Sequence, residues 1–147
     1  NSKFKKYFIN KFYCPDLPYK FYKELYKIAN TSIDISDGLI SDMNKLINKQ
    51  KLSFDISINK IPTSKNLEFC LKMKNKNKYP YLFSGDDYQI LFTASVKKRS
   101  LIKSIAKKNN QKITIIGKIT TGYKKNSIKL DNKSQNLTHF KGYSHKF

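Results

Sequence analysis

The sequence predicts a layered domain of mixed helices and strands, of the α/β or α+β kind. Segments with alternating apolar and polar residues take turns along the chain with segments whose apolar residues recur every three or four positions. At 147 residues, 39% of them hydrophobic and 14% aromatic, the chain is long enough to bury a core. We find no internal repeat and no convincing linker, so the pattern indicates one domain.

The first expected element is a helix over residues 16–29. Asp16 has a side chain suited to cap it, Pro18 lies in its first turn, and apolar residues then recur at helical spacing. A short strand over residues 31–36 follows, because isoleucines alternate there with polar residues.

A turn at Asp37 and Gly38 leads from this strand into the second expected helix. From there helical spacing and strand-like alternation continue to take turns. The further expected helices cover residues 39–49, 68–74 and 96–109. The further expected strands cover residues 52–58, 88–94, 113–120 and 128–130. A turn at Asp131 and Asn132 and an irregular tail complete the pattern.

The charge balance is strongly basic, with 30 Lys and Arg against 10 Asp and Glu and a net charge of +20. Such a balance is typical of proteins that bind nucleic acid. All of these cations except Arg99 are lysines, however, whereas the reading of base edges relies on the forked arginine side chain. We therefore favour a solvated basic surface over nucleic-acid binding. A stand-alone RNA- or polyanion-binding domain is the alternative.

Cysteine content and hydropathy exclude several other classes. Cys14 and Cys70 stand far apart and have no partner at ligand spacing, which excludes a zinc module and gives no disulfide framework. No apolar run approaches the about 20 residues that a membrane-spanning helix needs. The N-terminal segment also lacks the apolar stretch of a secretion signal. The sequence therefore predicts a cytoplasmic protein with no membrane partner.

Three of the ten acidic residues, Asp34, Asp37 and Asp42, fall within nine positions. Asp34 and Ser36 share the polar face of the expected strand, and Asp37 follows at its end. The helix that starts at Gly38 would add free N–H groups, which favour a phosphate. Carboxylates beside such a helix end suit Mg²⁺, whose coordination substrate phosphates complete. The alternative is that Asp37 only caps the helix.

A second acidic pair, Asp86 and Asp87, comes just before the expected strand at residues 88–94. Because neighbouring side chains of an extended segment point in opposite directions, one carboxylate can face a ligand while the other holds the loop. The alternative is an ordinary turn. The sequence has no common phosphate-loop or nucleophile motif, and His139 and His145 lie in the tail.

Four blocks of the chain together carry a family resemblance, at residues 32–42, 84–93, 113–120 and 142–147. They resemble, in order, the blocks I/V-D-x-S-D-G-L, G-G-D/E-D-Y-E-L-x-F-T, I-G-x-I/V-T and G-Y/F/W-x-H-F of the C-terminal half of the thiamine-monophosphate kinase family. That family belongs to the superfamily of aminoimidazole ribonucleotide synthetase. The resemblance therefore implies an α+β fold, a three-layer α/β/α C-terminal domain.

The resemblance also implies a reaction, the transfer of the γ-phosphoryl group of ATP to thiamine monophosphate to yield thiamine diphosphate and ADP. Asp34 and Asp37 would bind Mg²⁺, and Ser36 would contact the ATP phosphates. Asp86 would hold thiamine monophosphate, and Tyr143 would lie against its aromatic rings. No side chain is assigned to covalent catalysis, because phosphoryl transfer depends mainly on positioning and charge neutralisation.

The chain departs from the family at three positions. Ser84 replaces the first glycine of the second block, Gln89 replaces its glutamate, and Lys146 is inserted in the closing block. These changes concern the substrate contacts more than the metal contacts.

The resemblance further implies that residues 1–147 are a single C-terminal domain of a longer chain. The N-terminal ATP-binding half, which in the family carries most of the nucleotide pocket and the homodimer interface, is absent, so this portion alone should be inactive. Another ATP-dependent enzyme of the same superfamily is the alternative. The Gly-Asp-Asp-Tyr sequence at residues 85–88 and the aromatic tail favour the kinase.

Overall fold

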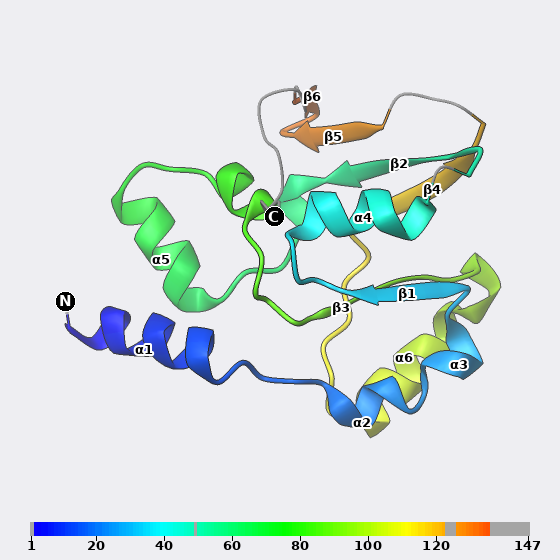
Figure 1. Cartoon of the computed structure of the whole chain (residues 1–147), viewed down its shortest axis with the longest axis horizontal. Coiled ribbons are helices and arrows are strands. Elements are labelled where there is room, and N and C mark those ends of the chain that lie inside the picture. Colours follow the sequence, from blue (N-terminus) through cyan, green and yellow to red (C-terminus); the bar gives the residue numbers. More distant parts are fainter. Residues whose placement is uncertain (1, 49, 123–125, 136–147) are drawn as a thin grey trace, which may run out of the picture.

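Helices and strands alternate along residues 2–48, 50–122 and 126–135, the part of the chain that this computed structural model describes (Figure 1). The α-helices are α1 (Ser2–Tyr13), α2 (Tyr19–Tyr22), α3 (Leu25–Ile28), α4 (Leu39–Ile47), α5 (Lys65–Met73) and α6 (Arg99–Lys108). The strands are β1 (Thr31–Asp34), β2 (Leu52–Ser57), β3 (Ile90–Thr93), β4 (Gly117–Thr121), β5 (Ser127–Leu130) and β6 (Lys133–Ser134). Short 3₁₀ helices are η1 (Ile58–Lys60), η2 (Tyr79–Phe83) and η3 (Val96–Lys98). The predicted α+β class is confirmed.

The strands form two separate sheets. β1 and β3 make an antiparallel pair in which Thr31 lies opposite Thr93 and Asp34 lies opposite Ile90. The second sheet has the order β4-β2-β5-β6. It is mixed, because β2 runs antiparallel to β4 but parallel to β5. The pair β1–β3 matters most for the site, since Asp34 is its last residue.

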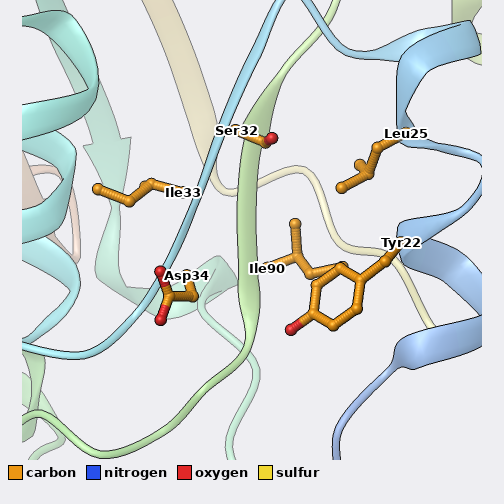
Figure 2. A pocket seen from close by; sticks show the side chains of 6 residues that line it. All are labelled: Tyr22, Leu25, Ser32, Ile33, Asp34 and Ile90. Carbon is orange, nitrogen blue, oxygen red and sulfur yellow. The ribbon is translucent and has the colours of Figure 1, made fainter.

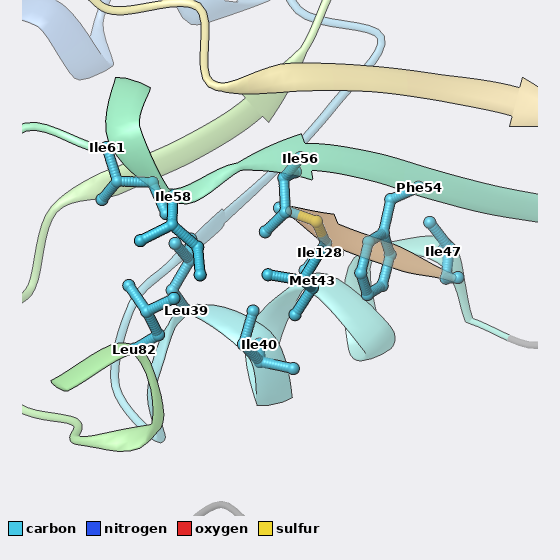
Figure 3. Packing of buried hydrophobic residues seen from close by; sticks show 10 residues of the cluster. All are labelled: Leu39, Ile40, Met43, Ile47, Phe54, Ile56, Ile58, Ile61, Leu82 and Ile128. Carbon is cyan, nitrogen blue, oxygen red and sulfur yellow. The ribbon is translucent and has the colours of Figure 1, made fainter. Parts of the chain in front are cut away.

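Two clusters of buried apolar side chains lie on the two faces of the pair β1–β3. Side chains alternate along β3, so Leu91 packs against the larger cluster while Ile90 and Phe92 pack against the smaller one. The larger cluster joins α4 to the second sheet and η1 (Figure 3); its buried members are Leu39, Ile40, Met43, Ile47, Phe54, Ile56, Ile58, Ile61, Leu82 and Ile128. The smaller cluster joins α2, α3 and α6 through Phe21, Ile28 and Ile105. Helices therefore cover both faces of this strand pair.

The expected helix over residues 16–29 is wrong in two respects. Pro18 stands at the N-cap of α2 without a side-chain hydrogen bond, and Asp16 instead forms an ion pair with Lys11. The helix is also divided into α2 and α3. At the junction the Glu24 N–H donates to the Phe21 carbonyl oxygen, three residues back, at 2.9 Å, so the chain tightens there and the regular α-helical bonding is interrupted.

The expected strand over residues 113–120 begins later than predicted, at Gly117. Ile113 packs against the smaller cluster and Ile116 against the larger one. The segment before β4 therefore connects the two layers, and Figure 1 shows it running from α6 to the second sheet. A regular strand begins only once the chain reaches β2.

Helix α1 is not predicted by the apolar periodicity. Many of its apolar side chains, including Phe12 and Tyr13, are exposed, so no stripe facing a core marks it in the sequence. Its contact with the rest of the chain includes a stack of Phe4 on Phe69 of α5, with ring centroids 5.2 Å apart. Within the described residues, no helix combines the length and the apolar character needed to span a membrane.

Candidate functional site

The segment after β1 and the segment before β3 lie side by side as an extension of the strand pair. The Ile35 N–H donates to the Gln89 carbonyl oxygen at 2.9 Å, and the Tyr88 N–H donates to the Ile35 carbonyl oxygen at 2.9 Å. One step further, the Asp86 N–H donates to the Ser36 carbonyl oxygen at 3.0 Å. Both acidic motifs of the sequence are thus held together, although almost 50 residues separate them.

Two glycines allow this close approach. A Cβ atom on Gly85 would come within 1.9 Å of the Ser36 carbonyl oxygen, and one on Gly38 would come within 2.8 Å of the Phe83 backbone. Gly38 also has a φ of +108°, which side-chain-bearing residues rarely adopt. The glycines of the two blocks therefore serve the same contact, one from each side.

Asp42 anchors the turn between β1 and α4 from the protein interior. Its side chain is completely buried. One carboxylate oxygen accepts hydrogen bonds from the Ser36 N–H at 2.9 Å and from the Asp37 N–H at 3.0 Å. The other oxygen accepts from Lys45 Nζ at 2.8 Å. In the sequence Asp42 is one of the clustered acids, and its place among the apolar residues of α4 is the signal that it is buried.

Asp37 is the second acid at this turn. Gly38, and not Asp37, is the N-cap residue of α4. The Asp37 carboxylate forms an ion pair with Lys45, and the Asp37 side chain keeps about a quarter of its surface exposed. The hydrogen bonds to Asp37 and then to Asp42 raise the pKa of Lys45 above its ordinary value. Lys45 therefore links the partly exposed carboxylate of Asp37 to the buried carboxylate of Asp42, and the acidic cluster in the sequence does not predict this contact.

Asp34 ends β1 with an exposed side chain and faces an open hollow of about 390 Å³. Figure 2 shows the hollow between the strand pair and the helices; its lining is Tyr22, Leu25, Ser32, Ile33, Asp34 and Ile90. Burial, and second the negative charge of Asp34, raise the pKa of the Tyr22 phenol. The carboxylate of Asp34 is thus accessible beside a partly apolar surface.

Asp86 and Tyr88, in the loop before β3, both have a strained backbone conformation. Both have left-handed conformations, with φ of +64° and +49°. The Tyr88 hydroxyl donates to Asp86 Oδ1 at 3.1 Å. This hydrogen bond, then the charge of Asp86, then burial and lastly the charge of Asp34 raise the pKa of Tyr88. The charges of Asp34 and Asp86 therefore both act on the Tyr88 phenol.

Asp87, the next residue of this loop, has a different environment. Desolvation of its carboxylate, and second the negative charge of Asp86, raise the pKa of Asp87 above its ordinary value. Beside it, the Gln89 side-chain amide donates to the backbone oxygen of Asp16 at 3.1 Å. Gln89, one of the departures from the family pattern, thus ties this loop to the segment before α2.

The structure therefore brings four of the five predicted site residues to one end of the strand pair: Asp34, Ser36, Asp37 and Asp86. The fifth, Tyr143, lies outside the described residues. Within the described part of the chain, no group of three or more His, Cys, Asp or Glu side chains could hold a metal ion. The two carboxylates predicted to bind a cation, those of Asp34 and Asp37, offer oxygen donors. Such a set fits Mg²⁺, which takes one or two protein carboxylates and completes its shell with water and phosphate oxygens.

Sequence comparison relates most of the chain to a known family. Residues 27–129 match the family described as AIR synthase related protein, C-terminal domain. Thiamine-monophosphate kinase of Buchnera aphidicola subsp. Schizaphis graminum is 39% identical over 121 residues, which is 79% of this chain and 37% of that protein. Thiamine-monophosphate kinase of Aquifex aeolicus is 43% identical over 72 residues, which is 48% of this chain and 24% of that protein. The chain thus spans little more than a third of the length of the first of these relatives and about a quarter of the second.

Structure comparison leads to the same group. AaThiL complexed with AMPPCP and TMP superposes with a TM-score of 0.75 and 30% identity over 97% of this chain and 42% of that one. Thiamine monophosphate kinase from Aquifex aeolicus superposes with a TM-score of 0.70 and 30% identity over 90% of this chain and 42% of that one. The fold described above is therefore similar to that of a protein whose structure is solved in complex with AMPPCP and TMP.

Proposed function

The chain belongs to the AIR synthase related protein family by its match to the C-terminal domain, and we propose from this that it is the C-terminal portion of an ATP-dependent thiamine-monophosphate kinase. The complete protein would transfer the γ-phosphoryl group of ATP to thiamine monophosphate and release thiamine diphosphate and ADP. Residues 1–147 would supply one side of the site. An N-terminal half, absent from this sequence, would supply the rest.

One observation carries this proposal: the hydrogen bond from the Asp86 N–H to the Ser36 carbonyl oxygen, with Gly85 packed against it. It joins the acidic turn that suits a metal and phosphates to the acidic loop that suits an acceptor. A kinase that phosphorylates a phosphate needs both substrates within reach of each other. The two turns, joined by this hydrogen bond, would form such a common site. Two turns that only cap a helix or reverse the chain would not need to contact each other.

On the nucleotide side, Asp34 and Asp37 would hold Mg²⁺, which when bound neutralises charge on the phosphates. The carboxylates of Asp34 and Asp86 are exposed, and within the described residues only Asp37 of these three acids is paired with a lysine, Lys45, so a bound cation would also reduce the repulsion between this end and the phosphates of ATP. Ser36 has already committed its backbone N–H to Asp42. Its contact with a phosphate would therefore come from the side-chain hydroxyl.

On the acceptor side, the Asp86 carboxylate would attract the positively charged thiazolium ring of thiamine monophosphate. Its left-handed backbone and the hydrogen bond from Tyr88 fix where that charge lies. Tyr143 would pack on the rings, as expected from the closing block. The homodimer that the family resemblance implies stays a prediction, because the surface assigned to it is not part of this chain.

The direct test measures thiamine diphosphate formed by the complete protein with ATP and Mg²⁺. Thiamine monophosphate is the acceptor, and thiamine, which has no phosphate to receive the group, is the matched control. We expect thiamine diphosphate from the first and none from the second, in step with release of ADP. ADP release that needs a different acceptor would point to another enzyme of the superfamily instead. Salt-sensitive RNA binding without any ATP turnover would favour the polyanion-binding alternative.

A further inference from the structure

The buried Asp42 is an unusual choice of residue for its place in α4. Its neighbours on the helix, Leu39, Ile40, Met43 and Ile47, are buried apolar side chains of the larger core cluster. A carboxylate taken out of water costs several kcal/mol unless its hydrogen bonds are complete. The carboxylate oxygens of Asp42 have hydrogen-bond partners, because within the described residues no buried side-chain nitrogen or oxygen lacks one. The charge is therefore accommodated through contacts that an apolar residue could not make.

The hydrogen bonds of the Asp42 carboxylate join it to Ser36, Asp37 and Lys45. One oxygen of Asp42 accepts both the Ser36 N–H and the Asp37 N–H, so two successive peptide groups are held by a single atom. The other oxygen accepts from Lys45, and the same ammonium group pairs with the Asp37 carboxylate. Asp42 thus restrains Asp37 twice, directly at the backbone and through Lys45 at the side chain.

We propose that Asp42 is a positioning residue for this site. Its carboxylate fixes the peptide groups of Ser36 and Asp37, so that their side chains stay where the divalent cation and the phosphates bind. The inference rests on the proposed function for the identity of those ligands. It adds that the accuracy of the metal and phosphate contacts depends on a residue that touches neither. Groups that orient metal ligands in this way typically change metal affinity by about 10–100-fold when they are replaced.

The test compares Asp42→Asn with Asp55→Asn in the complete protein. Asparagine keeps the size of the buried side chain, but it removes the charge and turns an amide group toward a backbone N–H or Lys45. Asp55 is the matched control, because it also pairs with a lysine, Lys129 at 3.3 Å, but on β2. Mn²⁺ replaces Mg²⁺ as the probe, and its binding is measured by electron paramagnetic resonance.

We expect Asp42→Asn to weaken Mn²⁺ binding by about 10-fold or more. We also expect hydrogen–deuterium exchange in a peptide covering residues 35–38 to rise by a similar factor, while exchange in β2 stays as in the parent protein. Asp55→Asn should change neither the Mn²⁺ affinity nor exchange in that peptide. Parent-like affinity and exchange in a folded Asp42→Asn protein would overturn the proposal.

The proposal can still be tested if Asp42→Asn does not fold, or if the proposed function is wrong. Should Asp42→Asn fail to fold, exchange in the parent protein is the remaining test: amides of Ser36 and Asp37 that exchange as fast as those of open loops would refute the anchoring. Neither Mn²⁺ binding nor exchange depends on the acceptor. A protein that makes no thiamine diphosphate but loses Mn²⁺ affinity with Asp42→Asn would thus refute the proposed function and support the positioning role.

Discussion

Gly85 lies so close to Ser36 that a Cβ atom on the glycine would come within 1.9 Å of the Ser36 carbonyl oxygen. That same oxygen accepts the Asp86 N–H at 3.0 Å. The register of the two acidic turns therefore depends on a missing side chain as much as on a hydrogen bond. Any atom added at Gly85 must push the two turns apart, and with them Ser36 and Asp86.

Gly85→Ala should lower the free energy of unfolding by about 2–4 kcal/mol, because the clash is with backbone that cannot rotate away. Urea unfolding of the complete protein measures this. Gly122→Ala is the matched control: Gly122 has a φ of +96°, but no atom of the described residues lies within 4 Å of the added Cβ, so this variant should lose only about 1 kcal/mol from backbone strain. Equal losses in the two variants would show that crowding at Ser36 is unimportant.

Asp34→Asn should sharply reduce the rate of thiamine diphosphate formation and raise the Mg²⁺ concentration needed for half-maximal rate. The amide preserves the shape of the side chain but removes the negative charge that a hard cation prefers. We expect about a 100-fold loss in kcat and about a 10-fold rise in the Mg²⁺ requirement. Asp55→Asn serves again as the control. A Mg²⁺ titration identical to that of the parent protein would remove Asp34 from the metal site.

The order of most elements was predictable from apolar spacing. The strands around Ile33, Phe54 and Ile128 and the helix begun at Leu39 occur where alternation or helical spacing places them. Two of the departures have a common cause. Helix α1 exposes its apolar side chains, and residues 113–116 cross between two clusters, so neither segment shows the one-sided burial that periodicity detects.

The site was predictable as separate motifs but not as a structure. Clustered acids in a basic chain drew attention to Asp34, Asp37 and Asp86. The pairing that joins them depends on β1 and β3, which lie far apart in the sequence, and on glycines whose close contacts no local pattern shows. Asp42 belongs to the same acidic cluster, but its role was not predictable, because a buried anchor and a solvent-exposed ligand can be the same residue type in a sequence.

Asp86→Asn should weaken the binding of thiamine monophosphate more than the binding of ATP. Asparagine tolerates the left-handed backbone at this position and can still accept the Tyr88 hydroxyl, so only the charge is lost. We expect the KM for thiamine monophosphate to rise by about 10-fold, with the KM for ATP nearly unchanged. Tyr143→Ala should act in the same direction. An equal rise in both KM values would argue that Asp86 does not select the acceptor.

Asp87→Asn should stabilise the protein, and the gain should depend on pH. Desolvation, and second the charge of Asp86, raise the pKa of Asp87 above its ordinary value of 3.8. Between that value and the raised one, the folded protein holds a proton that the unfolded chain has lost, so folding stability falls as pH rises. The neutral asparagine avoids this loss.

Because the Asp87 side chain is exposed overall, the gain at about pH 7 should stay below about 1 kcal/mol, and it should vanish near pH 3. Urea unfolding of both proteins across this range measures it, and a gain of the same size at both ends would mean that the charge of Asp87 is not its source.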